Sequence, residues 1–171
     1  MGTSSTKKVI KNVSGALTEE AALLTSAGAG DAGKLAALDS SGRLDSTMMP
    51  VGIGADTQVI TTSEALAAGD WVNIWNSSGA KARKADATTA GKHAMGFVLS
   101  AFGSAASATV YFEGTNTQVT GQTAGDVFLS TTAGLGTATA PSSAGNVVQP
   151  IGVATSTTTV NFQYNRPITL A

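Results

Sequence analysis

The chain has 171 residues, of which 42% are hydrophobic, 5% aromatic and 12% charged, with a formal net charge of −1 and no cysteine. This length suits one ordinary domain, and the lack of cysteine excludes disulfides and thiolate chemistry. The small net charge argues against nucleic acid and anionic membranes as partners. No segment has the apolar run of a signal peptide or a membrane span, so we expect a soluble protein made in the cytosol.

Residues 1–33 are predicted to form an extended N-terminal arm that becomes ordered on assembly with a neighbouring subunit. Within it, Leu17, Ala21 and Leu24 recur at helical spacing over at most two turns, which is marginal for an isolated helix. A disordered tail is the alternative, but a mere tail has no use for so many apolar residues. The candidate contact residues of the arm are Lys7, Lys8, Val9, Ile10, Val13, Leu17 and Leu24.

Residues 34–57 are predicted to be a connector rich in turns. Asp39 is followed by two serines and Gly42, which is the chemistry of a type I turn.

From residue 58 onward the sequence predicts short strands rich in β-branched and aromatic residues, separated by Gly, Ser, Asp or Pro. Many short strands at regular spacing are typical of a sandwich or barrel, so the predicted fold is all-β. The predicted strands are 58–62, 71–75, 95–99, 108–112, 116–120, 127–130, 147–148, 151–154 and 159–162.

The predicted β-domain, 58–171, contains an internal repeat. Residues 68–112 and 124–162 each open with Ala-Gly-Asp, and these triplets lie 56 positions apart, as do Gly96 and Gly152. Turn glycines and apolar strand residues recur at the same spacing in both copies, while the surface residues between them differ. This pattern indicates two duplicated β-units. No titratable or metal-binding set recurs in both copies, so the repeat is interpreted as scaffold.

The chain offers few residues for catalysis or metal binding. Its single histidine, His93, has no sequence neighbour that completes a metal site or a triad. The acidic residues are scattered singly except at 19–20, so no carboxylate pair indicates glycoside hydrolysis. Gly28, Gly30 and Gly33 match a dinucleotide fingerprint but lack its strand and helix. We therefore expect no enzyme, no catalytic residue, no cofactor and no metal.

The segment around the two tryptophans is the other candidate site. On a strand, Trp71, Asn73 and Trp75 share one face, and Val72 and Ile74 share the other. If Val72 and Ile74 fill the core, the tryptophans face outward as a subunit interface, where Trp is a frequent hot-spot residue. The alternative is a strand covered on both faces within the subunit. A sugar-binding or hydrolytic site that stacks rings on both tryptophans is a third, weaker interpretation.

Several segments resemble a known family. GKLAALDSSGRLD at 33–45 and MPVGIGADT at 49–57 resemble bacteriophage structural proteins. EALAAGDWVNIW at 64–75, ARKAD at 82–86 and GNVVQPIGVA at 145–154 are similar to capsid cement (decoration) proteins of tailed phages. The resemblance covers residues 33–171, and its Gly-Lys…Leu-Asp-x-x-Gly-x-Leu element also occurs in phage head and tail fibres.

The resemblance implies a β-domain that sits as a homotrimer on the outer surface of the virion capsid. Such a protein clamps adjacent subunits of the major capsid protein and stabilises the shell without catalytic residues. The arm residues would then be capsid contacts, with Lys7, Lys8 and Lys11 facing an acidic capsid surface. A head or tail fibre component is the alternative.

Overall fold

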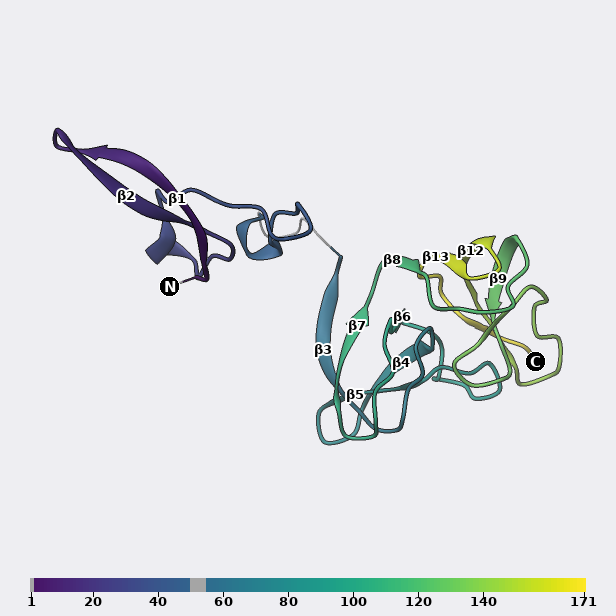
Figure 1. Cartoon of the computed structure of the whole chain (residues 1–171). Helices are drawn as coiled ribbons and strands as arrows, with labels where there is room; N and C mark the ends of the chain where they lie inside the picture. Colours follow the sequence, from purple (N-terminus) through teal and green to yellow (C-terminus); the bar gives the residue numbers. More distant parts are fainter. Residues whose placement is uncertain (1, 50–54) are drawn as a thin grey trace. The chain divides into compact units, whose positions relative to one another are not determined.

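The computed structural model describes residues 2–49 and 55–171 (Figure 1). The chain divides into two compact units, Met1–Gly54 and Ala55–Ala171, which we call the N-terminal and C-terminal units. Strands dominate both, so the all-β prediction is confirmed. The helical elements of the described residues are two short 3-10 turns, η1 (Ala29–Asp31) and η2 (Ser46–Met48).

The N-terminal unit is built on an antiparallel hairpin of β1 (Ser4–Val13) and β2 (Ala16–Leu23). Its turn residues, Ser14 and Gly15, have φ values of 53° and 90°, as a tight hairpin turn of the right twist requires. The helical interpretation of Leu17, Ala21 and Leu24 is therefore wrong. A separation of four residues is also a multiple of the strand period of two, so Leu17 and Ala21 share a strand face as well.

Residues of the predicted connector complete this unit. Leu23 N donates to Leu35 O at 2.8 Å and Ala37 N donates to Leu23 O at 2.7 Å, so the chain after the hairpin adds a short third segment at its base. The predicted turn at Asp39 is confirmed, since Gly42 N donates to Asp39 O at 3.0 Å. The rest of the predicted connector includes 50–54, which lie outside the described residues.

The first half of the C-terminal unit is a closed barrel in which four antiparallel pairings and one parallel pairing join five strands. The parallel pairing, β3 with β5, closes the barrel. The strands are β3 (Thr57–Thr62), β4 (Trp71–Asn76), β5 (Ala80–Lys84), β6 (Gly96–Phe97) and β7 (Ser107–Tyr111).

The second half is an open antiparallel sheet of five strands in the order β10-β9-β12-β13-β8, with a separate two-stranded pairing of β11 and β14. The predicted strand at 116–120 is wrong beyond residue 116. The strands are β8 (Gly114–Asn116), β9 (Gly125–Leu129), β10 (Gly136–Thr137), β11 (Val147–Val148), β12 (Pro150–Ser156), β13 (Thr159–Phe162) and β14 (Ile168–Thr169).

The barrel and the open sheet place their strands in the same relative order. Taken from β5, the barrel runs β5-β4-β6-β7-β3, and the sheet runs β10-β9-β12-β13-β8. Gly96 and Gly152 take corresponding places, because each allows the backbone of the next strand to approach closely. A Cβ on Gly96 would lie 2.5 Å from Tyr111 O, and one on Gly152 would meet Asn161 O. That the two halves arose by duplication stays a prediction.

The C-terminal unit has two hydrophobic cores. The barrel interior is filled by small and medium side chains, as a narrow barrel requires. It contains Ile60, Leu66, Val72, Ala82, Val98, Ala108 and Val110. The second core holds an aromatic group, with ring centroids 5.7 Å apart for Trp71 and Phe97 and 5.4 Å apart for Trp71 and Phe162. It joins residues of the barrel strands to residues of the open sheet, so the two halves share one body.

Candidate functional site

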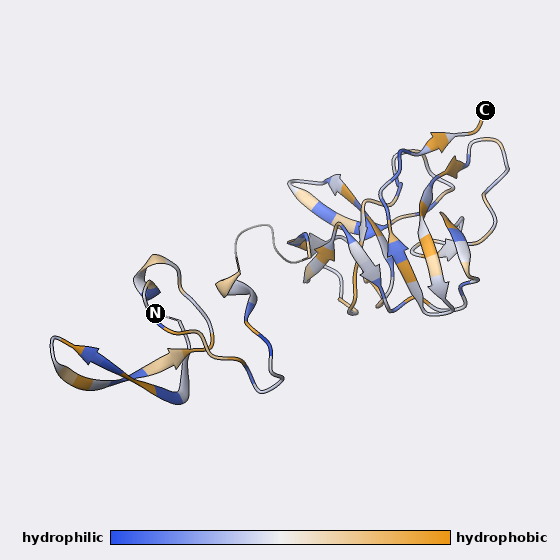
Figure 2. Ribbon diagram, turned by 90° about the horizontal axis from the view of Figure 1, so that it is seen from above, coloured by the Kyte–Doolittle hydropathy of each residue, from blue (hydrophilic) through white to orange (hydrophobic). Residues whose placement is uncertain are grey.

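The hairpin of the N-terminal unit carries most of the residues predicted for the arm, and its register decides which of them share a face. Ile10 lies opposite Glu19, and Asn12 lies opposite Leu17. Because side chains alternate along a strand, Ile10 and Leu17 are diagonal neighbours on one face, while Val13 lies on the other face. Figure 2 shows hydrophobic and hydrophilic segments alternating along both strands.

The apolar side chains in the half of the hairpin nearer its turn are exposed. Ile10 has 72% of its surface exposed, Leu17 74% and Val13 47%. Val9 and Leu24 are half-buried, and only the base of the hairpin, at Ala22 and Leu23, is buried. A two-stranded ribbon has no second layer to cover its apolar side chains, so these remain available to a partner. We call Ile10 and Leu17, which share one face, the apolar hairpin surface.

Ion pairs across the strands neutralise two of the predicted basic contacts. Lys8 Nζ lies 2.8 Å from Glu19 Oε2, and Lys11 Nζ lies 2.8 Å from Glu20 Oε2. Lys7 is exposed. Exposed pairs of this kind contribute little to stability, but each one satisfies the charge within the hairpin. That Lys8 and Lys11 meet an acidic capsid surface stays a prediction; in the structure both are paired within the hairpin.

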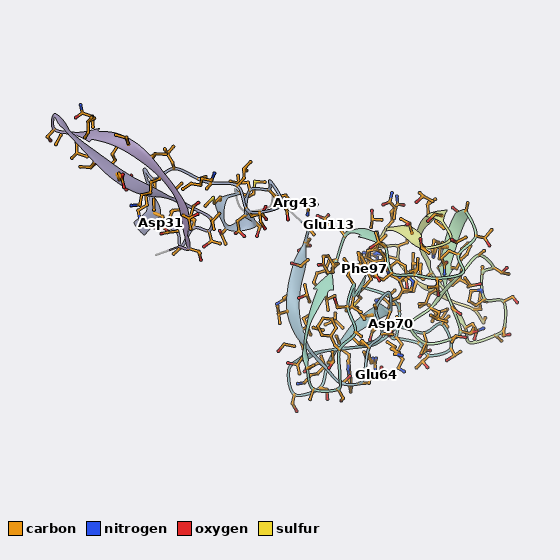
Figure 3. The ribbon with its side chains drawn as sticks, in the orientation of Figure 1. Asp31, Arg43, Glu64, Asp70, Phe97 and Glu113 are labelled. Carbon is orange, nitrogen blue, oxygen red and sulfur yellow. The ribbon has the colours of Figure 1, made fainter. Side chains whose placement is uncertain are left out.

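Sequence reasoning missed Asp31, which organises the base of the hairpin (Figure 3). Asp31 Oδ2 accepts hydrogen bonds from Ala27 N at 2.8 Å and Gly2 N at 2.9 Å, and its Oδ1 lies 3.0 Å from Lys34 Nζ. The bond from Ala27, the bond from Lys34 and the bond from Gly2 hold the pKa of the Asp31 carboxyl well below its usual range. An isolated acid among glycines and alanines is the signal that could have identified it.

A pocket of about 460 Å³ lies beside Asp31 within the N-terminal unit. Exposed apolar side chains stand at its border, with 56% of Leu35 and 41% of Met49 exposed. Its lining residues are Leu23, Ser26, Asp31, Lys34, Leu35, Ala36, Thr47, Met48 and Met49.

The structure corrects the tryptophan prediction. Trp71 and Asn73 are fully buried within the C-terminal unit, so neither can form a subunit interface. The reason is that β4 is covered on both faces: Val72 points into the barrel, and Trp71 into the second core. The alternative of a strand covered on both sides is therefore the correct one. A stacking platform of both tryptophans is also wrong, because Trp71 offers no exposed ring.

Trp75 differs from Trp71 because its side chain is only half-buried. Its Nε1 donates to Ser63 Oγ at 3.2 Å, and Arg83 Cζ lies 4.5 Å from the ring centroid. Arg83 Nε also donates to Asn73 Oδ1 at 2.9 Å, so the guanidinium covers the ring from a fixed position. The prediction that Trp75 belongs to a subunit interface stays a prediction.

His93 lies in a turn-rich loop and takes part through its backbone. Asn73 Nδ2 donates to His93 O at 2.9 Å, and the imidazole ring centroid is 6.3 Å from that of Tyr164. Burial lowers the pKa of His93. Within residues 2–49 and 55–171, no group of three or more His, Asp or Glu side chains is placed to hold a metal ion. In the same described ranges, no helix has the length and apolar character needed to cross a membrane.

No family model, no curated protein and no solved structure matches the chain.

Proposed function

We propose that this chain is a virion structural protein that decorates the outside of a tailed-phage capsid and stabilises it by clamping adjacent major capsid protein subunits. The proposed role is structural rather than catalytic, and the proposed state is a homotrimer. The resemblance of residues 33–171 to capsid cement proteins supports the major capsid protein as the partner.

The observation that carries the proposal is the apolar hairpin surface. Ile10 and Leu17 lie diagonally on one face with about three quarters of each side chain exposed (72% and 74%). Burying exposed aliphatic side chains of this size on association is favourable by roughly 25 cal/mol per Å² of apolar surface. The hairpin thus exposes apolar side chains that a partner can bury, as an attachment element requires.

The flanking ion pairs support binding to a protein surface. Since Lys8 and Lys11 are already paired with Glu19 and Glu20, these four residues bring no net charge to the contact. The backbone groups on the outer edges of β1 and β2 can in addition pair with a strand of the partner. We therefore assign attachment to the hairpin. The C-terminal unit then forms most of the mass that covers the capsid surface.

The test is binding to heads assembled from the major capsid protein encoded in the same genome. The intact chain is expected to co-sediment with expanded heads, and Ile10→Ser and Leu17→Ser are each expected to weaken binding at least about tenfold, as loss of an apolar anchor does. Ile168→Ser is the matched control, because Ile168 is 67% exposed but belongs to the C-terminal unit. Equal binding by all variants would refute the hairpin as the attachment element.

Stoichiometry separates decoration from the fibre alternative. Decoration requires hundreds of copies per virion, whereas a fibre component is present in few. Native mass spectrometry should give three times the chain mass of 17.0 kDa. A low copy number on purified virions would overturn the decoration proposal in favour of a fibre component.

A further inference from the structure

The N-terminal unit buries very few of its own side chains. Among its described residues, 2–49, only Ala22, Leu23 and Asp31 are buried. A two-stranded hairpin needs a further packed layer to be stable, and a unit this small without disulfides gains little from its own burial. Contact with a partner that covers more of its apolar surface therefore stabilises this unit.

A loop of this unit carries two exposed leucines. Asp39 N donates to Arg43 O at 2.9 Å, which closes the loop and brings together the residues on either side of it, Leu38 and Leu44. Their side chains are 60% and 37% exposed. The loop is fixed further, because Asp39 Oδ1 accepts from Arg43 N at 2.9 Å. We call residues 38–44 the leucine loop.

The pocket of about 460 Å³ in this unit lies next to the leucine loop along the chain. Leu35 and Ala36, which precede the loop, and Met48 and Met49, which follow it, line the pocket, whereas no residue of the loop does. The volume is within the range in which proteins bind organic groups. The loop thus lies outside the pocket of its own chain, although its leucines suit the apolar part of the lining.

Unpaired charges accompany both surfaces. Among the described residues, neither Arg43 of the loop nor Asp45 forms an ion pair. Asp45 Oδ1 accepts from Thr47 Oγ1 at 2.6 Å and from Thr47 N at 2.9 Å, and Thr47 lines the pocket. These bonds lower the pKa of Asp45, so its carboxylate stays charged. The loop therefore carries a free cation, and the border of the pocket a free anion.

We infer that a second copy of this chain covers this surface, with the leucine loop of one copy seated in the pocket of the next and Arg43 beside Asp45 of the partner subunit. A contact between two different surfaces of the same chain is heterologous, so it is satisfied in every copy only when the copies close into a ring. The ring size of three rests on the proposed function, whereas the contact itself does not.

The ring contact and the attachment element use different parts of the unit. Figure 3 shows Arg43 at the end of the N-terminal unit that is remote from the hairpin turn. Ile10 and Leu17 lie in the half of the hairpin nearer that turn. The apolar hairpin surface therefore stays free for a capsid subunit when the leucine loop is occupied.

The first experiment measures association by sedimentation equilibrium. The intact chain should form a trimer, and Leu38→Ser should weaken association at least about tenfold, as loss of an apolar anchor does. Val59→Ser is the matched control, because Val59 is 64% exposed but belongs to the C-terminal unit, and it should associate as the parent does. Both side chains are exposed, so both variants should fold. A monomeric parent, or equal association of the two variants, would overturn the inference.

A disulfide tests the seating of the loop directly. The chain has no cysteine, so a disulfide forms only between introduced ones. Leu44→Cys and Met49→Cys are carried by separate chains, coexpressed and oxidised. The pair should give a covalent dimer in much higher yield than either variant alone. No dimer from the pair, or an equal yield from Leu44→Cys alone, would place the loop elsewhere and overturn the seating in the pocket.

Head binding separates this inference from the proposed function. Ile10→Ser should lose head binding but keep the association of the parent, whereas Leu38→Ser should lose association. A chain that associates through the loop but does not bind heads would support the contact and refute the attachment role. A chain that binds heads but never associates would overturn the contact and leave the attachment role standing.

Discussion

Asp31 Oδ2 accepts a hydrogen bond from Gly2 N at 2.9 Å, which joins the start of the chain to a turn 29 residues later. The same oxygen accepts from Ala27 N, so one buried carboxylate fixes both ends of the path that contains the hairpin. Together with the backbone bonds of Leu23, this carboxylate holds the base of the hairpin.

Acid should loosen the hairpin of the N-terminal unit. The hydrogen bonds lower the pKa of Asp31 below its ordinary value of 3.8, so the folded unit binds fewer protons than the unfolded chain. The stabilisation is fully present above that value and is lost progressively as pH falls from it toward the lower pKa of the folded unit, so it is only partly lost at pH 2. NMR signals of β1 and β2 measured from pH 7 to pH 2 should lose their dispersion in the acid range.

Asp31→Asn should remove this acid transition and lower the stability of the hairpin at pH 7. Asp126→Asn, at an exposed position of β9, is the control and should leave the pH profile of the hairpin unchanged. A hairpin transition that persists in Asp31→Asn would assign the effect to another group.

Trp71→Ala should destabilise the C-terminal unit by about 3–5 kcal/mol, as removal of a fully buried aromatic side chain does. Trp75→Ala should cost much less, since that ring is half-buried and shares its contacts with solvent. Urea unfolding followed by the fluorescence of the remaining tryptophan measures both changes. Similar losses for the two variants would contradict the placement of Trp71 in the second core.

Gly152→Ala should destabilise the open sheet by about 2–4 kcal/mol. Gly152 has φ of 145°, and an added Cβ would collide with the backbone oxygen of Asn161 on β13. Gly103→Ala is the control, since an added Cβ there meets nothing within 4 Å, and it should change stability by less than about 1 kcal/mol. Thermal unfolding distinguishes the two outcomes.

Gln149→Met should destabilise the C-terminal unit by about 2–4 kcal/mol, because two buried hydrogen bonds and one partly buried hydrogen bond are lost without a replacement. The Gln149 amide accepts from Ala94 N at 2.8 Å, donates to Ala94 O at 2.8 Å and donates to Asn165 O at 2.9 Å. It is fully buried, unlike Gln163, where the same substitution should have little effect. Equal unfolding midpoints for the two variants would contradict this account.

The strands of the C-terminal unit were largely predictable, because β-branched and aromatic residues alternate with turn residues there. The two-residue strands β10 and β14 were missed, and so was β5, since its sequence AKARK is dominated by small and charged residues with low strand propensity. Tertiary packing decides it: Ala82 is fully buried inside the barrel while Lys81 and Arg83 face outward.

The candidate sites were less predictable, because they depend on which face of a strand is covered. The sequence places Trp71, Asn73 and Trp75 on one face, but only the packing of the open sheet buries Trp71 and leaves Trp75 at the edge. In the hairpin, the pairing of Lys8 and Lys11 with glutamates depends on a register that no local pattern specifies.

The parallel pairing of β3 with β5 leaves the barrel without a free edge, and the two edge strands of the open sheet, β8 and β10, have only three and two residues. Long exposed edges are the templates on which misfolded chains add strands and form fibrils. Since the described strands of the C-terminal unit offer so little edge, this unit should resist aggregation even when many copies are concentrated in a small volume.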